Sequence, residues 1–177
     1  NNARSDMETA SKLGIHPFVK LATNRRSLMA KTTAKARSAI SNSLQVRPND
    51  ERYESALMSR GKAYLDLQLW KAATESFSEL ISLSTTNSES YKNRGDALFS
   101  LKRYQEAIRD YEQAATLNPI DSVNFVALGK VYAALGDYET ARFHFDKSIQ
   151  LDPNSSHAYA ARGFLSVQTG DYSLGFP

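Results

Sequence analysis

Four glycines at a constant interval of 34 residues restrict the fold of this chain more than any other feature of its sequence. They are Gly61, Gly95, Gly129 and Gly163. The residue four places before each glycine is large, and this series runs Leu57, Tyr91, Phe125 and Tyr159. The residue nine places after it is aromatic, and this series runs Trp70, Tyr104, Tyr138 and Tyr172. A constant interval of this length indicates repeated units that stack along one axis and bury a continuous core.

The spacing inside each unit predicts two antiparallel amphipathic helices. In the first half, the large residues and the glycine recur at intervals of three and four. In the second half, a small and an aromatic residue do the same, as with Ala141 and Phe145. Because a glycine inside a helix costs about 0.5–1 kcal/mol relative to alanine, we interpret each glycine as a point of close helix packing. The Gly-Asp pair at 136–137 and the Asp-Pro pair at 152–153 are typical of helix ends.

This pattern resembles the tetratricopeptide repeat family, whose signature is a large residue, Leu-Gly, Tyr, Ala, Phe and a closing Pro over 34 residues. The best match, residues 122–155, contains Phe125, Leu128, Gly129, Tyr132, Gly136, Tyr138, Ala141, Phe145 and Pro153. The resemblance implies an all-α, right-handed α-solenoid of stacked antiparallel helix pairs. It covers repeats at about 54–87, 88–121 and 122–155, and an incomplete fourth at 156–177, within a solenoid that we place at 50–177.

The fourth repeat departs from the pattern. Gly175 stands where alanine is expected, and Pro177 leaves no room for a second helix. We therefore expect an exposed apolar edge around Phe164 and Val167. Further chain, a second copy of this chain or the partner would cover this edge, so self-association is one of the expected interactions.

The first fifty residues differ from the rest in charge and pattern. They carry nine Lys or Arg against three Asp or Glu, and no acidic residue lies between Glu8 and Asp50. We predict a helix over 24–48 that caps the open end of the stack. Its packing stripe would consist of Leu28, Met29, Ala36, Ile40 and Leu44. Residues 1–23 are predicted to be extended or disordered unless the segment 15–21 is held against the solenoid.

The basic stretch over residues 9–49 has three interpretations. It is a solvated helix face with a flexible tail, an arm that resembles a targeting presequence or binds an acidic partner, or a nucleic-acid contact. The first is favoured because charge runs usually face water. The last is disfavoured because the stretch has few aromatic residues for stacking. An intracellular, cytoplasmic location is favoured over an organelle, although the compartment is not determined by the sequence.

Candidate chemistry is sparse. The chain has no cysteine, and His16, His144 and His157 lie in no spacing that is typical of a metal site or a catalytic base. The Ser-x-x-Lys pattern of penicillin-recognising enzymes occurs at 59–62, but the residues of this segment already belong to the repeat pattern. No apolar run is long enough for a membrane span. The sequence therefore predicts no catalytic residue, no cofactor, no bound metal and no small-molecule substrate.

The resemblance implies that the first helix of each repeat forms a concave wall, on the face opposite the packing stripe. The wall positions are Met58, Ser59, Lys62 and Leu65; Lys92, Asn93, Asp96 and Phe99; Val126, Ala127, Lys130 and Ala133; and Ala160, Ala161, Phe164 and Val167. The residues expected to bind a partner are Met58, Ser59, Lys62, Lys92, Asn93, Asp96, Phe99, Val126, Lys130, His157 and Phe164. The first two walls are mixed and polar, and the last two are small and apolar apart from Lys130, so the partner should be a protein or peptide with polar and apolar segments. Alternatively, further repeats cover the apolar end.

Two specialisations of the family do not fit. The clamp for the C-terminal carboxylate of Hsp70 or Hsp90, and the asparagine ladder of O-GlcNAc transferase, are each matched here by Asn93 alone. The sequence thus favours a non-enzymatic adaptor or scaffold that holds a peptide or helix on its concave face. The alternatives are a targeting or regulatory module of a larger protein or enzyme, and a structural subunit of a transport, ciliary or cell-cycle assembly.

Overall fold

The computed structural model describes residues 33–170 of the chain, and this part consists of helices joined by turns. Residues 33–43 are helical. They are followed by α3 (Tyr53–Asp66), α4 (Trp70–Leu83), α5 (Ser88–Ser100), α6 (Tyr104–Leu117), α7 (Ser122–Leu135), α8 (Tyr138–Leu151) and α9 (Ser156–Thr169). None of these helices is both long enough and apolar enough to cross a membrane.

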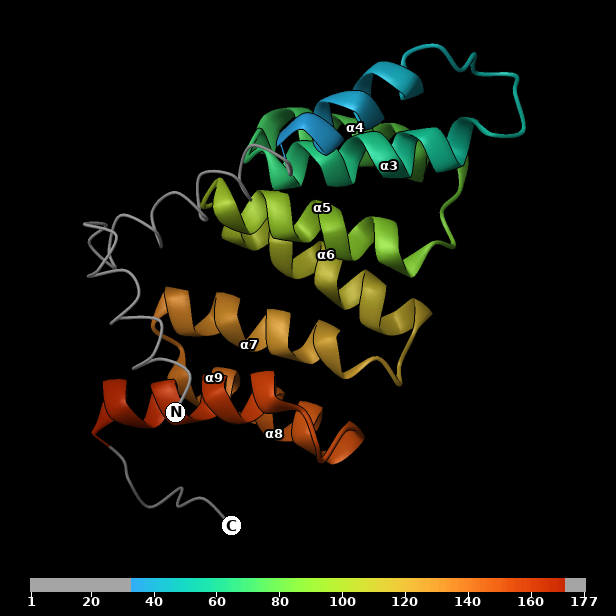
Figure 1. Cartoon of the computed structure of the whole chain (residues 1–177). Coiled ribbons are helices and arrows are strands. Elements are labelled where there is room, and N and C mark those ends of the chain that lie inside the picture. The colour runs from blue at the N-terminus through green and yellow to red at the C-terminus, as the bar shows by residue number, and fades with distance from the viewer. Residues whose placement is uncertain (1–32, 171–177) are drawn as a thin grey trace, which may run out of the picture.

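The helices stack as antiparallel pairs, α3 with α4, α5 with α6 and α7 with α8, and α9 follows on the last pair (Figure 1). Contacts also join α3 to α5, α5 to α7 and α7 to α9. The first helices of successive repeats therefore form one wall. The all-α solenoid that the sequence predicts is confirmed.

The glycines of the first three repeats lie where the two helices of a pair pack closely. A Cβ atom built on Gly61 would lie 2.5 Å from the Phe77 ring, and one on Gly95 would lie 2.7 Å from the Tyr111 ring. Gly129 faces Phe145 in the same way. Since real Cβ contacts do not come this close, the glycines are needed for close packing, as the sequence predicts.

The turn after the first helix of each repeat requires a left-handed residue. Gly136 ends α7 with φ of +83° and Gly170 ends α9 with φ of +71°. Asp137 then caps α8, and its side chain accepts a hydrogen bond from the Thr140 backbone N–H. In the two earlier repeats the left-handed positions are Gln68, with φ of 58°, and Lys102, with φ of 60°. These two residues adopt a conformation that favours glycine.

Replacing Lys102 by glycine is expected to raise the free energy of unfolding by about 1 kcal/mol, because the left-handed strain is relieved. Urea denaturation followed by circular dichroism measures the change. Lys102→Ala is the matched control, since it removes the same side chain and keeps the Cβ atom. If the alanine variant is stabilised as much as the glycine variant, backbone strain is not the cause.

The N-terminal helix appears at the α3–α4 end of the stack in Figure 1, and its Ala36 and Ser43 are buried. It ends at residue 43 rather than continuing to 48. The backbone N–H groups of Gln45 and Val46 each bond to a carbonyl three residues back, which turns the chain before Pro48. Leu44 follows the helix and is exposed, so it does not extend the packing stripe.

The capping role of this helix stays a prediction. The predictions for residues 1–23, for the start of the helix at 24–32, and for the C-terminal segment 171–177 lie outside the described residues.

Candidate functional site

The wall formed by the first helices carries two adjoining cavities. The central cavity has a volume of about 590 Å³ and lies along α5, α7 and the turn before α9. Its lining comprises Lys92, Asp96, Phe99, Ser100, Tyr111, Ser122, Val123, Val126, Ala127, Lys130, Asp152, Asn154, Ser155, Ser156 and His157. The C-terminal cavity, of about 400 Å³, is lined by Phe99, Lys130, Ala133, Ala134, Phe145, Ala161, Phe164, Leu165 and Gln168. Phe99 and Lys130 line both cavities, so the two form one groove.

Asp96 is the best-anchored charge in the central cavity. Lys92 Nζ lies 3.0 Å from Asp96 Oδ2, and the Tyr111 hydroxyl donates to Asp96 Oδ1 at 2.8 Å. Burial, together with the neighbouring Asp96 charge, raises the pKa of Tyr111 far above its ordinary value. The phenol therefore stays protonated and acts as a hydrogen-bond donor. Asp96 is held in place from two sides.

The lysines of the wall differ in their pairing. Lys62 Nζ lies 2.7 Å from Glu89 Oε1, and Lys92 is paired with Asp96. In the described part of the chain, no carboxylate forms an ion pair with Lys130. The exposed ammonium of Lys130 is therefore the uncompensated positive charge of the groove.

The C-terminal cavity is mostly apolar. Phe164 is 71% exposed and stands at its rim, and Val167, one turn further along α9, is 64% exposed. Phe99 is half-buried and packs against Tyr104 with 5.6 Å between ring centroids. Alanines of α7 and α9 leave the space between these aromatic side chains open. An apolar side chain could bury its surface here.

The structure places the sequence-predicted residues in two groups. Those that line the groove are Lys92, Asp96, Phe99, Val126, Lys130, His157 and Phe164. Met58, Ser59 and Lys62 belong to α3 and line neither cavity. Asn93 is 6% exposed, and its amide donates to Met58 Sδ at 3.6 Å. Its side chain is thus occupied inside the protein.

Several groove residues were missed by the sequence analysis. Asn154 and Ser155 come from the α8–α9 turn, Tyr111 from α6 and Gln168 from the end of α9. The Asp152-Pro153 pair signals a helix end there, but it carries no sign that the following turn reaches the wall. Asp152 Oδ1 accepts a hydrogen bond of 3.1 Å from the Asn154 backbone N–H.

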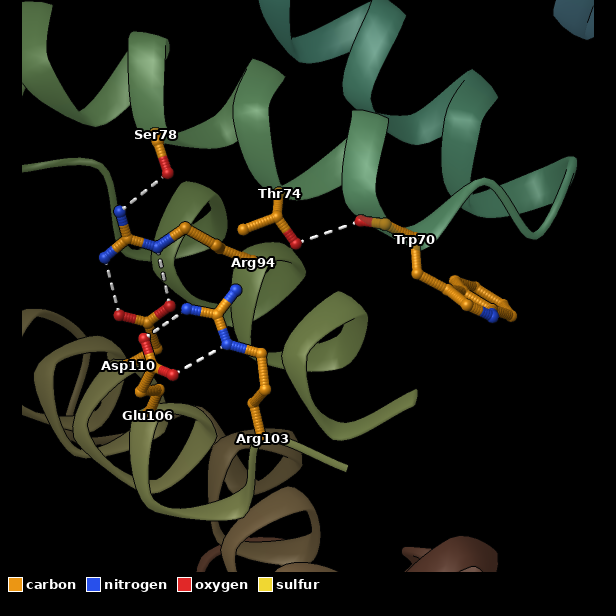
Figure 2. Close-up of polar contacts among 7 residues, drawn as sticks. All are labelled: Trp70, Thr74, Ser78, Arg94, Arg103, Glu106 and Asp110. Carbon is orange, nitrogen blue, oxygen red and sulfur yellow. Dashed lines mark hydrogen bonds and ion pairs between the residues drawn. The ribbon is translucent and has the colours of Figure 1, made fainter. Parts of the chain in front are cut away.

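A second set of charges holds the repeats together. Arg94 donates to both Asp110 oxygens at 2.7 Å and to Ser78 Oγ at 3.1 Å, linking α5 to the second helices on both sides of it (Figure 2). Arg60 and Arg162, one residue before the first and fourth repeat glycines, also form ion pairs. Arg60 pairs with Glu79 of its own repeat, and Arg162 pairs with Asp146 of the preceding repeat. Asp110 lines neither cavity. These pairs are structural.

The third repeat replaces this arginine by Leu128, and His144 occupies the position of the acid. The His144 ring stacks on Tyr132 at 5.4 Å and on Phe125 at 6.3 Å between centroids, and its Nδ1 is buried without a hydrogen-bond partner. Burial, and next the charge of Lys147, lower the pKa of His144. Nothing in this setting resembles a catalytic base, because no nucleophile accompanies the ring. His144 packs among aromatic rings as part of the third repeat.

Stability is expected to fall on acidification through His144. Its folded-state pKa lies below the unfolded value of about 6.5. The unfolded state therefore binds the proton first, and stability is lost as the pH falls from about 6.5 toward the lower folded pKa. Thermal melting between pH 7.5 and 5 measures the slope, and His144→Gln should flatten it. An unchanged slope in this variant would assign the effect to other groups.

The model of the tetratricopeptide repeat matches residues 88–121 and again residues 124–155. No curated protein sequence matches the chain. Among residues 33–170, no group of three or more His, Asp or Glu side chains could hold a metal ion.

Solved structures resemble the chain over most of its length. A crystal structure of MamA is 29% identical, with a TM-score of 0.72 over 81% of this chain and 84% of that one. The first TPR of Spaghetti (RPAP3), bound to the HSP90 peptide SRMEEVD, is 22% identical, with a TM-score of 0.63 over 68% and 96%. The TPR2B domain of yeast Sti1 in its pHsp70 complex is 23% identical, with a TM-score of 0.62 over 65% and 97%. The last two show the fold alone.

Proposed function

Because the chain is a tetratricopeptide repeat protein, we propose that it is a non-enzymatic adaptor or scaffold that holds a peptide or helix of another protein in the groove. The observation that carries this proposal is the continuity of the two cavities along the wall of first helices. A continuous groove suits an elongated ligand, because successive side chains of a peptide can occupy successive parts of it.

The chemistry of the groove supports a protein partner. Its central part offers the Asp96 carboxylate and the hydroxyl and amide groups of the α8–α9 turn, which can bond to a peptide backbone. Its C-terminal part offers apolar surface around Phe99 and Phe164. The RPAP3 and Sti1 structures hold Hsp90 and Hsp70 segments. In this chain the carboxylate clamp is matched by Asn93 alone, and that residue is buried against Met58.

The apolar rim also favours a second candidate function, that of a structural subunit in a larger assembly. Phe164 and Val167 are both strongly exposed on α9. Apolar surface of this kind marks interaction sites. In that case another subunit, or a further part of a longer protein that contains this module, would contact α9 instead of a peptide.

The test compares two exposed phenylalanines on neighbouring helices. Phe164 lines the groove, whereas Phe143 on α8 is 61% exposed and lines neither cavity. Peptides selected by the full chain from a random display library would be titrated by calorimetry against wild type, Phe164→Asp and Phe143→Asp. Binding should be lost in the first variant and kept in the second. Equal affinity in all three proteins would place the interaction elsewhere.

A further inference from the structure

The C-terminal cavity contains one charge, that of Lys130, within an otherwise uncharged lining. The other charges of the groove lie in the central cavity. Lys92 and Tyr111 hold Asp96, and Asp152 accepts a hydrogen bond from the Asn154 backbone N–H. No described carboxylate pairs with Lys130. The charge that a ligand of this cavity can complement is therefore positive.

Apolar side chains accompany Lys130 in the C-terminal cavity. Phe99 lies along the same two cavities, and Phe164 stands at the rim with most of its surface exposed. The volume of about 400 Å³ lies within the usual range of binding pockets, roughly 300–1,000 Å³. A large apolar side chain that enters here would bury the exposed surface of Phe164 and displace water from around the ammonium group. Loss of water strengthens an ion pair made at that place.

The continuity of the groove favours a peptide over an isolated small molecule. A ligand that fills the C-terminal cavity passes Phe99 and Lys130 and continues into the central cavity. There the Ser155 and Asn154 side chains of the α8–α9 turn supply polar groups for a backbone. The occupant is thus a chain with a polar backbone, one large apolar side chain and one carboxylate close to it.

We propose that the groove recognises an internal peptide segment in which a large aliphatic or aromatic residue lies within about three residues of an Asp or Glu. The apolar side chain fills the C-terminal cavity and the carboxylate pairs with Lys130. This inference rests on the proposed function and specifies the partner of the same site. It requires no free C-terminus, because the carboxylate comes from a side chain.

The experiment uses a positional-scanning library of nonapeptides that are acetylated at the N-terminus and amidated at the C-terminus. The full chain should enrich peptides with Leu, Ile, Phe or Met near Asp or Glu. In single titrations of a selected peptide, exchange of Glu for Gln should weaken binding to wild type by about tenfold, the usual size for a charge-assisted hydrogen bond. Lys130→Glu should reverse the preference from acidic to basic peptides, and Phe164→Ala should remove the apolar preference alone.

Lys71→Glu is the matched control, because Lys71 is exposed on α4 and lines neither cavity. It makes the same change in net charge and should leave the selection unaltered. Circular dichroism would confirm that each variant is folded, which the exposure of the substituted side chains favours.

The outcomes separate the two proposals. If peptides bind in a manner that Phe164→Asp abolishes but show no acidic preference, or if Lys130→Glu does not reverse it, the inference fails and the proposed function stands. If wild type selects no peptide, both fail. If sedimentation shows a dimer of the wild type that Lys130→Glu or Phe164→Asp dissociates, the occupant is a second copy of this chain, and the inference is overturned.

Discussion

Replacement of Asp110 by alanine is expected to lower the free energy of unfolding by about 3–5 kcal/mol, the usual cost of removing one partner from a buried ion pair. The Asp110 side chain is 7% exposed, and both of its oxygens accept hydrogen bonds from Arg94. Without it, the Arg94 side chain, which is 22% exposed, keeps Ser78 Oγ as a hydrogen-bond partner and the face of the Tyr91 ring as a neighbour, but has no carboxylate to balance its charge. Urea denaturation measures the loss.

The matched control for Asp110 is Asp146, which pairs with the arginine at the same position of the fourth repeat. The Asp146 side chain is 39% exposed and its oxygen lies 3.0 Å from Arg162 Nη1. Asp146→Ala should therefore cost less than about 1 kcal/mol, as exposed pairs usually do. The double variant Arg94→Leu with Asp110→Leu should recover much of the loss, because no unpaired charge remains. Equal losses for Asp110→Ala and Asp146→Ala would contradict the role assigned to burial.

Replacement of Phe145 by alanine is expected to cost about 3–5 kcal/mol, the usual range for a large buried side chain that leaves a cavity. Phe145 is 2% exposed, and its ring fills the space beside Gly129. Phe143→Ala, on the same helix but at a side chain that is 61% exposed, is the control. It should change stability by well under half as much, since most of its surface already faces water. Chemical denaturation of both variants decides the matter.

The complementary change at Gly129 tests the same contact from the other helix. Gly129→Ala gains helix propensity, but its Cβ would overlap the Phe145 ring, so a net loss of about 1–3 kcal/mol is expected. The double variant Gly129→Ala with Phe145→Leu should lose less stability than the sum of the losses of the two single variants, because the smaller side chain makes room for the methyl group. Strict additivity would show that the two residues do not press on each other.

The fold could be predicted from the sequence because the 34-residue repeat determines it. Gly61, Gly95 and Gly129 each face the aromatic residue sixteen places later, and Gly136 ends its helix where the pattern predicts. The end of the N-terminal helix was less predictable. Periodicity alone predicts that this helix continues past residue 43, whereas the chain turns there ahead of Pro48.

The sequence predicts only part of the groove. Helical spacing finds the residues on the wall of first helices, such as Phe99 and Lys130, because they repeat with the glycine. It cannot find Asn154, which reaches the groove through a turn, nor tell that Lys92 is paired while Lys130 is not. Asn93 shows the limit most clearly. Its place on the helix allows it to face the wall, but Met58 of the preceding repeat covers it.

The contacts described between helices join neighbouring repeats and reach no further along the stack. In a structure connected in this way, small rotations between successive repeats add up along the stack. The curvature of the wall can therefore adjust to the length of whatever lies against it while each hydrophobic layer stays closed. For the peptide ligand proposed above, such compliance would let the same repeats accommodate ligands of somewhat different shape.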